Sequence, residues 1–387
     1  MDSVTSDEAY QDEILPHVSR TFALTIPQLP ASLATPVTCA YLLCRIADTI
    51  EDEPALSAVA TRALMQGFVA VVEGSHDAAA LVAQLAPQLS PQTLPAEREL
   101  ILNMARVVRL TAQFSEPQRT AIRRCVEVMC DGMHQFQCTA SLRGLPRSSD
   151  LDDYCYYVAG VVGQMLTELF CAYSPQIMQR RRALHDLAVS FAQGLQMTNI
   201  LKDVWEDRSR GACWLPQDVF TRHGVDLATL SAVPHDPGFG AGLHELIGLA
   251  HLHLRNALAY TLLIPRHETG IRRFCLWAIG LAVLTLRKID ANPRFTAGTQ
   301  VKVTRRTVFW TQVLTGLAVR NDRMLIRLFE RAARGLPLAS ATEVPRMAHG
   351  APEPAAQREP STRLESGTHR EPQSLRPRRR SDGSAAP

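Results

Sequence analysis

Apolar residues recur at three- and four-residue spacing over most of the chain, which is the pattern of helices that bury one face. The clearest stretches are 41–50, 101–114, 121–136, 184–204 and 243–263. Prolines separate these stretches at positions typical of helix starts and stops: Pro16, Pro27, Pro30, Pro54, Pro95, Pro146, Pro216 and Pro265. Alternating strand patterns bounded by Asn-Gly or Asp-Gly turns are absent. The pattern predicts an all-α protein.

The composition changes near residue 341, where Pro, Ser, Arg, Glu and Gly replace the large apolar residues. Such a segment buries too little apolar surface to offset the entropy lost on ordering. No repeat of fixed period occurs, so a solenoid is not expected. We predict one all-α domain over residues 1–340 and a disordered tail over residues 341–387.

Charge and cysteine content narrow the class of protein. The formal net charge is only +3, and no general basic face is expected, so nucleic acid is not a predicted partner. The nine cysteines show no CxxC or Cys/His spacing, which favours reduced thiols in a cytoplasmic protein. The amino terminus is polar and acidic, unlike a signal peptide. The longest apolar run, 274–286, is too short to span a bilayer and is interpreted as a core helix.

Two copies of Asp-x-x-Glu-Asp stand at the ends of apolar helical stretches. On a helix, residues four apart share a face, so the two aspartates of each motif project together. Like charges at this spacing destabilise a helix, whereas Mg²⁺ prefers a few carboxylates completed by water and phosphate oxygens. The sequence therefore predicts a magnesium site that neutralises a departing diphosphate. Its ligands would be Asp48, Glu51, Asp52, Asp203, Glu206 and Asp207.

The acidic motifs allow two other interpretations. One copy is close to what chance gives, and a pair of charged helix ends would need no metal. A di-iron bundle would need a Glu-x-x-His motif on each of two helices. Only Glu73-Gly-Ser-His76 has that spacing, and its Gly-Ser centre indicates a loop, so the di-iron interpretation fails.

The chain resembles the squalene/phytoene synthase family, the head-to-head isoprenyl diphosphate synthases, over roughly residues 15 to 310. Five segments occur in the family order: Ser19-Arg-Thr-Phe22, Tyr41-Leu-Leu-Cys-Arg-Ile-Ala-Asp48, Tyr154 to Gly163, Gln196 to Asp207, and Trp214-Leu-Pro216. The resemblance implies an isoprenoid synthase fold, one large helical domain around a central cavity. It also implies small-molecule isoprenyl diphosphate substrates and Mg²⁺.

The residues and the resemblance together suggest roles in the site. Cations beside the carboxylate faces, and polar residues around them, would hold diphosphate: Ser19, Arg20, Arg45, Gln196, Asn199, Lys202 and Arg210. The resemblance places Tyr154 near the reacting carbons, with Tyr41 as a second catalytic tyrosine. Arg45 could instead form a salt bridge within its helix, Ser19 could be a helix cap, and either tyrosine could be a core residue.

The apolar part of the cavity would be dry and aromatic, because water would trap carbocations. Phe22, Phe274 and Trp277 could line it, although core packing explains them almost as well. The segment 154–163 is expected to be a helix whose small residues allow close approach of another helix or a substrate.

The squalene branch of the family reduces its cyclopropyl intermediate with NADPH, and the phytoene and dehydrosqualene branch does not. Val301-Lys302-Val303-Thr304-Arg305-Arg306 resembles the basic segment that squalene synthases place near the nicotinamide cofactor's phosphates. Lys302, Arg305 and Phe274 are therefore expected at the cofactor, and squalene synthase is our prediction. The inserted Thr304, and Ala212 where many members carry arginine, are departures from the pattern. A solvated basic helix start is the other interpretation of 301–306.

Further expectations concern oligomeric state, location in the cell, lipid contact and alternative activities. The protein is expected to be a cytoplasmic monomer. The Arg376–Arg380 cluster could give weak peripheral contact with anionic lipid, or the tail could be solvated and without function. Phytoene or dehydrosqualene synthase is the alternative activity, and a non-catalytic helical assembly factor with the same fold is the alternative from another class.

Overall fold

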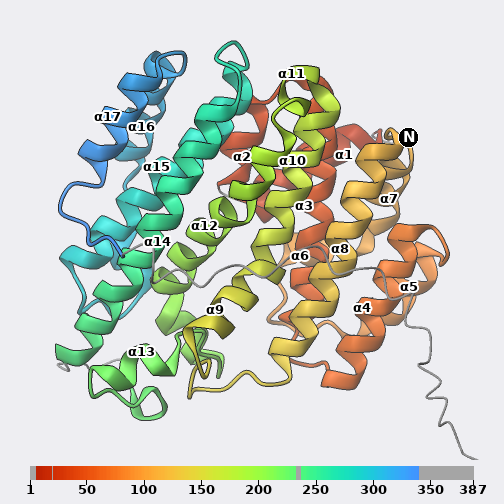
Figure 1. Ribbon diagram of the computed structural model, residues 1–387. Coiled ribbons are helices and arrows are strands. Elements are labelled where there is room, and N and C mark those ends of the chain that lie inside the picture. The colour runs from red at the N-terminus through yellow and green to blue at the C-terminus, as the bar shows by residue number, and fades with distance from the viewer. Residues whose placement is uncertain (1–5, 20, 232–236, 340–387) are drawn as a thin grey trace, which may run out of the picture. The chain divides into compact units, whose positions relative to one another are not determined.

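The computed structural model describes residues 6–19, 21–231 and 237–339, and these residues form helices joined by short loops (Figure 1). The first ten are α1 (Asp7–Val18), α2 (Phe22–Thr25), η1 (Ile26–Gln28), α3 (Ala31–Glu51), α4 (Ala58–Glu73), α5 (Ala78–Leu85), η2 (Ala86–Gln88), α6 (Pro95–Leu102), α7 (Met104–Ala112) and α8 (Glu116–Gln137). The next five are α9 (Ser148–Cys155), the π-helical turn η3 (Tyr156–Gly160), α10 (Val161–Tyr173), α11 (Pro175–Met178) and α12 (Arg181–Ser209). The last are α13 (Gln217–Arg222), η4 (Leu227–Thr229), α14 (Pro237–Leu263), α15 (Thr269–Ala291), η5 (Gly298–Val301), α16 (Arg305–Ala318) and α17 (Asp322–Ala332).

The all-α prediction is confirmed for the described residues, where the only β-type pairing is an isolated bridge between Leu145 and Pro216. Prolines stand at helix starts as expected: Pro30 and Pro216 precede α3 and α13, and Pro95 begins α6. Pro16 is an exception, since it lies inside α1, two residues before the helix ends. At this position proline removes the hydrogen bond to the carbonyl of residue 12, so the last turn of α1 is held by its other contacts. The predicted boundary at residues 340/341 lies at the edge of the described residues and stays a prediction.

The long helix α12 is the centre of the packing. It packs along α14 and also contacts α10 and α15, while α3 packs on α8 and α10. Side chains from α1, α3, α4, α7, α8 and α10 form one buried apolar cluster, and those from α12 to α15 form another. Val158 and Phe191 contact both clusters. Burial of a single leucine or isoleucine side chain contributes roughly 1.5–3 kcal/mol, so these clusters hold α3 and α12, the two helices that carry the acidic motifs.

The close packing of α10 on α12 depends on glycine. A Cβ atom at Gly163 would lie 2.4 Å from the carbonyl oxygen of Ala188, a distance that no relaxed side chain tolerates. This agrees with the prediction that small residues in 154–163 permit close approach of a second helix.

Three helical stretches have the length and hydropathy to cross a membrane, judged by length and composition only: Ala31–Glu51, Ser148–Tyr173 and Thr269–Ala291. The sequence-based prediction that residues 274–286 are too short to span a membrane considered only part of the helix. The helix that contains them, Thr269–Ala291, has 23 residues. The protein interior buries 72%, 50% and 61% of the three apolar windows, respectively.

All nine cysteines lie in the described ranges and are free, and eight of them are buried, so the prediction that there is no disulfide framework is confirmed.

Candidate active site

The first acidic motif occupies the last turn of α3. The helix ends at Asp52, its C-cap, and Pro54 follows two residues later. The side chain of Asp48 is 31% exposed, and its carboxylate lies 3.5 Å from the guanidinium of Arg45. Burial raises the pKa of Asp48 to about 6, and the negative charge of Asp52 adds to the shift while Arg45 opposes it. Burial also raises the pKa of Glu51 well above its usual value. The protein's own cations therefore only partly compensate these partly buried carboxyls.

The second acidic motif lies near the end of α12. Lys202 Nζ is 3.0 Å from a carboxylate oxygen of Asp203. Glu206 accepts a 2.8 Å hydrogen bond from the backbone N–H of Gly298 in η5, and its other oxygen, Oε2, is buried without a partner. Burial, followed by the charge of Asp203, raises the pKa of Asp207 to about 7.

The two motifs lie close to each other, although some 150 residues separate them in the sequence, and the region between them is called here the cleft. Arg210, just beyond α12, lies 4.0 Å from Asp52 at the end of α3. The charge of Asp52 contributes to the raised pKa of Asp207 on the opposite helix. Charges of Glu51, Asp52 and Asp207 all contribute, after burial, to the raised pKa of Tyr154. The structure thus brings both motifs together around one tyrosine.

The donor set fits Mg²⁺ shared with a phosphate ligand better than a closed protein cage. Within residues 6–19, 21–231 and 237–339, no group of three or more His, Cys, Asp or Glu side chains is arranged to hold a metal by itself. Mg²⁺ typically takes one or two carboxylates and fills the remaining positions with water and substrate phosphate. The partnerless Glu206 Oε2 and the buried, partnerless Nε of Arg45 are the atoms that such a ligand would satisfy.

Tyr154 is held in place by stacking against neighbouring aromatic rings. Its ring stacks on Trp214 with a centroid separation of 4.2 Å and an angle of 7°, and meets the edge of Phe136 at 5.4 Å. Trp214 is fixed by the Leu145–Pro216 bridge beside it. The π-helical turn η3 follows Tyr154 directly, and such turns are frequent at functional sites. Because its pKa is raised far above neutral, the hydroxyl stays protonated.

Tyr41 takes a different position. Its hydroxyl donates a 3.0 Å hydrogen bond to the carbonyl of Val18 and accepts a 3.2 Å bond from Arg45. Its ring packs 5.0 Å from Phe22, which lies 6.4 Å from Phe274 on α15. Tyr41 therefore orients Arg45 and joins the aromatic wall above the first motif.

The other predicted residues are distributed around the cleft. Asn199 accepts a 3.4 Å hydrogen bond from Lys202, and Gln196 is half-buried one turn earlier on α12. The Ser19 hydroxyl accepts a 3.0 Å bond from the N–H of Phe22, so it does act as a cap. Lys302 and Arg305 are exposed and follow η5, which packs on α12. Arg20 lies outside the described residues.

Several residues of the site were not predicted from the sequence. Gly298 sits so close to the second motif that a Cβ there would be 3.0 Å from a carboxylate oxygen of Asp203. Asp152, two residues before Tyr154, is buried, and burial raises its pKa to about 7. Nothing in their local sequence marks either residue, because both depend on contacts with α12. Arg208 donates to the carbonyls of Leu142 and Leu230, whereas Arg210 lies 4.0 Å from Asp52.

Comparison with known proteins agrees with this geometry. A family model described as squalene/phytoene synthase matches residues 15–307. The chain belongs to the squalene/phytoene synthase family. The resemblance noted in the sequence is thereby confirmed.

The curated relatives carry squalene synthase names. Squalene synthase R6 of Phoma sp. is 30% identical over 75% of this chain and 66% of its own length. Squalene synthase ERG9 of Saccharomyces cerevisiae is 27% identical over 86% of this chain and 72% of its own length. Squalene synthase clz20 of Cochliobolus lunatus is 31% identical over 56% of this chain and 50% of its own length. The chain thus spans between 50% and 72% of the length of these three relatives.

Solved structures support the fold. TcSQS in complex with the ligand E5700 superposes with a TM-score of 0.67 at 22% identity, covering 84% of this chain and 91% of that one. A dehydrosqualene synthase in complex with a ligand gives 0.57 at 22% identity, covering 83% and 97%. At this identity the likeness establishes the predicted all-α fold and does not separate the two activities.

Proposed function

We propose that the protein is a squalene synthase, a farnesyl-diphosphate farnesyltransferase. It joins two farnesyl diphosphates head to head (1'-1) through a cyclopropyl diphosphate intermediate, which is then reduced to squalene. The observation that carries the proposal is the pair of Asp-x-x-Glu-Asp helices facing one cleft, with Tyr154 between them and Arg210 of one side 4.0 Å from Asp52 of the other.

The polar part of the cleft binds the two diphosphates. Asp48, Glu51, Asp52, Asp203, Glu206 and Asp207 would hold Mg²⁺, which would neutralise the leaving diphosphate. Arg45, Lys202 and Arg210 add charge-assisted hydrogen bonds to phosphate oxygens, and Ser19, Arg20, Gln196 and Asn199 complete the polar surround. The support is the placement of each described cation within 4.0 Å of a motif carboxylate.

Tyr154 is the hydrogen-bond donor at the reacting end. A neutral phenol donates a hydrogen bond, so Tyr154 is suited to hold an oxygen of the departing diphosphate. Its stacking on Trp214 fixes the ring, so the hydroxyl needs little reorganisation during the reaction. Tyr41 assists by orienting Arg45.

The isoprenoid chains occupy the apolar side of the cleft. Phe22, Tyr41 and Phe274 form a continuous aromatic wall with centroid separations of 5.0 and 6.4 Å. Such a wall excludes water, which would otherwise capture a carbocation as an alcohol. NADPH would supply the hydride when bound; Lys302 and Arg305, which follow η5, would hold its phosphates, and Phe274 would contact the cofactor.

Product analysis tests the proposal. The purified chain is incubated with farnesyl diphosphate and Mg²⁺, with and without NADPH. Squalene that forms only with NADPH supports the proposal, and dehydrosqualene unaffected by NADPH refutes the reductive step. Preference for geranylgeranyl diphosphate would indicate a phytoene synthase, and no product under any condition would favour the non-catalytic assembly factor. We further propose that the protein acts on these small molecules as a cytoplasmic monomer with only weak peripheral membrane contact.

A further inference from the structure

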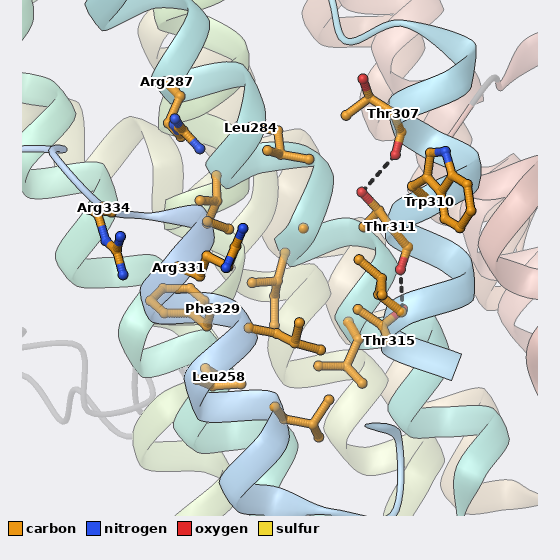
Figure 2. A pocket seen from close by; sticks show the side chains of 18 residues that line it. Leu258, Leu284, Arg287, Thr307, Trp310, Thr311, Thr315, Phe329, Arg331 and Arg334 are labelled. Carbon is orange, nitrogen blue, oxygen red and sulfur yellow. Dashed lines mark hydrogen bonds between the residues drawn. The ribbon is translucent and has the colours of Figure 1, made fainter. Parts of the chain in front are cut away.

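A second cavity lies away from the acidic cleft, between α14, α15, α16 and α17 (Figure 2). It measures about 510 Å³, within the range of small-molecule sites in proteins. On α15 it is lined by Leu276, Gly280, Val283 and Arg287, which share a face roughly opposite to Phe274. None of the residues that line it belongs to either acidic motif.

The walls of this cavity, called here the α14–α17 pocket, present mainly apolar groups to a ligand. Leucine, isoleucine and valine side chains from α14, α15 and α17 form one side. Threonines from α16 face them, but their hydroxyls are engaged: Thr311 donates to the carbonyl of Thr307 at 2.9 Å and Thr315 to that of Thr311 at 2.7 Å (Figure 2). Their methyl groups are therefore what a ligand would meet.

One end of the pocket is cationic. Figure 2 shows Arg287 of α15 together with Arg331 and Arg334 at this end, while Leu258 lies toward the other. Within the part of the chain that the structure describes, none of these three arginines forms an ion pair with a carboxylate. The segment 302–334 holds eight Lys or Arg and two Asp or Glu, a net charge of +6 against +3 for the whole chain. One of those two acids, Asp322, is already bound by Arg266 and Arg272.

We propose that the α14–α17 pocket binds a single-chain lipid with a phosphate or diphosphate head. The chain lies between α15 and α16, and the head lies at Arg287, Arg331 and Arg334. From Leu276 to Arg287 the wall of α15 is about 16 Å long at 1.5 Å per residue, which gives a narrow slot with one charged end. Guanidinium groups match phosphate oxygens in geometry and charge. The proposal does not depend on the catalytic activity proposed above.

The test is calorimetric titration of the full chain with dodecyl phosphate in EDTA, so that metal-dependent binding at the acidic cleft is suppressed. Saturable binding with one site per chain is expected, and dodecanol should bind at least tenfold more weakly. The double variant Arg287→Glu/Arg331→Glu should weaken dodecyl phosphate at least tenfold. Arg323→Glu/Arg327→Glu makes the same charge change at exposed positions outside the pocket and should leave the affinity within twofold.

A second pair of variants tests the slot itself. Leu284→Trp fills it and should abolish binding, whereas Leu317→Trp adds the same ring on α16 at a side chain that is 79% exposed and outside the pocket. Circular dichroism checks that each variant is folded. Equal losses in the pocket and control variants, or no loss in either, would overturn the proposal, as would displacement of dodecyl phosphate by NADPH.

Competition identifies the source of the ligand. Farnesyl phosphate and lysophosphatidic acid carry the same head on an isoprenoid and an acyl chain, respectively. Displacement of dodecyl phosphate by either compound supports the proposal. The compound that displaces it at the lower concentration identifies whether the natural ligand carries an isoprenoid or an acyl chain. If neither displaces it, the site does not recognise a single-chain lipid phosphate and the proposal is wrong.

Discussion

Replacing Gly298 by alanine perturbs the second acidic motif without substituting a charged residue. Gly298 begins η5, and its backbone N–H donates a 2.8 Å hydrogen bond to Glu206. An added Cβ would lie 3.0 Å from a carboxylate oxygen of Asp203, 3.0 Å from the carbonyl of Lys202 and 3.3 Å from Glu206 Oε1. The backbone carbonyl does not move freely, so η5 must shift away by a few tenths of an ångström, which lengthens the bond to Glu206.

The size of the effect follows from that bond. A hydrogen bond to a charged group contributes about 1.5–3 kcal/mol, and the other oxygen of Glu206 is buried without a partner. Weakening the bond should therefore reorient Glu206 at a cost near 1.5 kcal/mol, and each 1.4 kcal/mol is about tenfold in an equilibrium constant. If Glu206 helps to bind Mg²⁺, the Mg²⁺ concentration for half-maximal turnover should rise roughly tenfold.

The assay is the dependence of farnesyl diphosphate turnover on Mg²⁺ for the wild type and Gly298→Ala. Gly316→Ala in α16 is the matched control, since a Cβ there meets nothing within 4 Å. The control should keep its Mg²⁺ dependence and gain up to about 1 kcal/mol of stability from helix propensity. An unchanged Mg²⁺ dependence in Gly298→Ala would refute the role assigned to η5 as a support of the metal site.

Other predictions follow from the same geometry. Asp48→Ala and Asp203→Ala should each abolish turnover, with an unchanged circular dichroism spectrum; full activity in either would remove the metal assignment. Tyr154→Phe keeps the stack on Trp214 but loses the hydroxyl, so kcat should fall at least 100-fold with little change in the free energy of unfolding. Burial, with a contribution from Asp153, raises the pKa of Asp152 to about 7 from its usual 3.8, so the folded state retains a proton that the unfolded chain releases. Stability should therefore fall as pH rises from about 4 to 7, by at most about 1.4 kcal/mol per pH unit. Thermal melts of Asp152→Asn should show a smaller loss than the wild type, because Asp48 and Asp207 still contribute, whereas melts of the exposed Asp131→Asn control should keep the full loss.

The elements of the fold were predictable because helical periodicity is a local property. The 3.6-residue repeat of apolar positions reports which face of each helix is buried, and the described residues confirm it. Exact ends were less predictable. Pro16 lies within α1, where proline removes one hydrogen bond of the last turn, so packing against the rest of the protein overrides the residue's local preference.

The site was predictable where it consists of motifs and not where it depends on long-range contacts. Asp48 and Asp203 were predicted as site residues from the spacing of the acidic residues in each motif. The ion pair of Arg210 with Asp52 and the hydrogen bond of Gly298 to Glu206 were not predictable in this way. Each joins segments about 90 to 160 residues apart, and no local sequence pattern encodes such a contact. The raised pKa of Asp152 likewise comes from burial that its neighbours in sequence do not indicate.

The charges of the cleft require that its metal and its diphosphate bind together. Six motif carboxylates face three described cations, Arg45, Lys202 and Arg210, and the pKa values of Asp48 and Asp207 are raised to about 6 and 7 as a result of burial and mutual repulsion. A diphosphate alone would add negative charge to this cleft, whereas a divalent cation between carboxylate and phosphate is attracted by both. Binding of the two is therefore reciprocal, and each should raise the affinity for the other by the same factor. Titration of farnesyl diphosphate with and without Mg²⁺, and of Mg²⁺ with and without the unreactive thiolo analogue, measures that factor from both sides. Equal affinity for diphosphate in the absence of Mg²⁺ would mean that Arg45, Lys202 and Arg210 suffice to hold it.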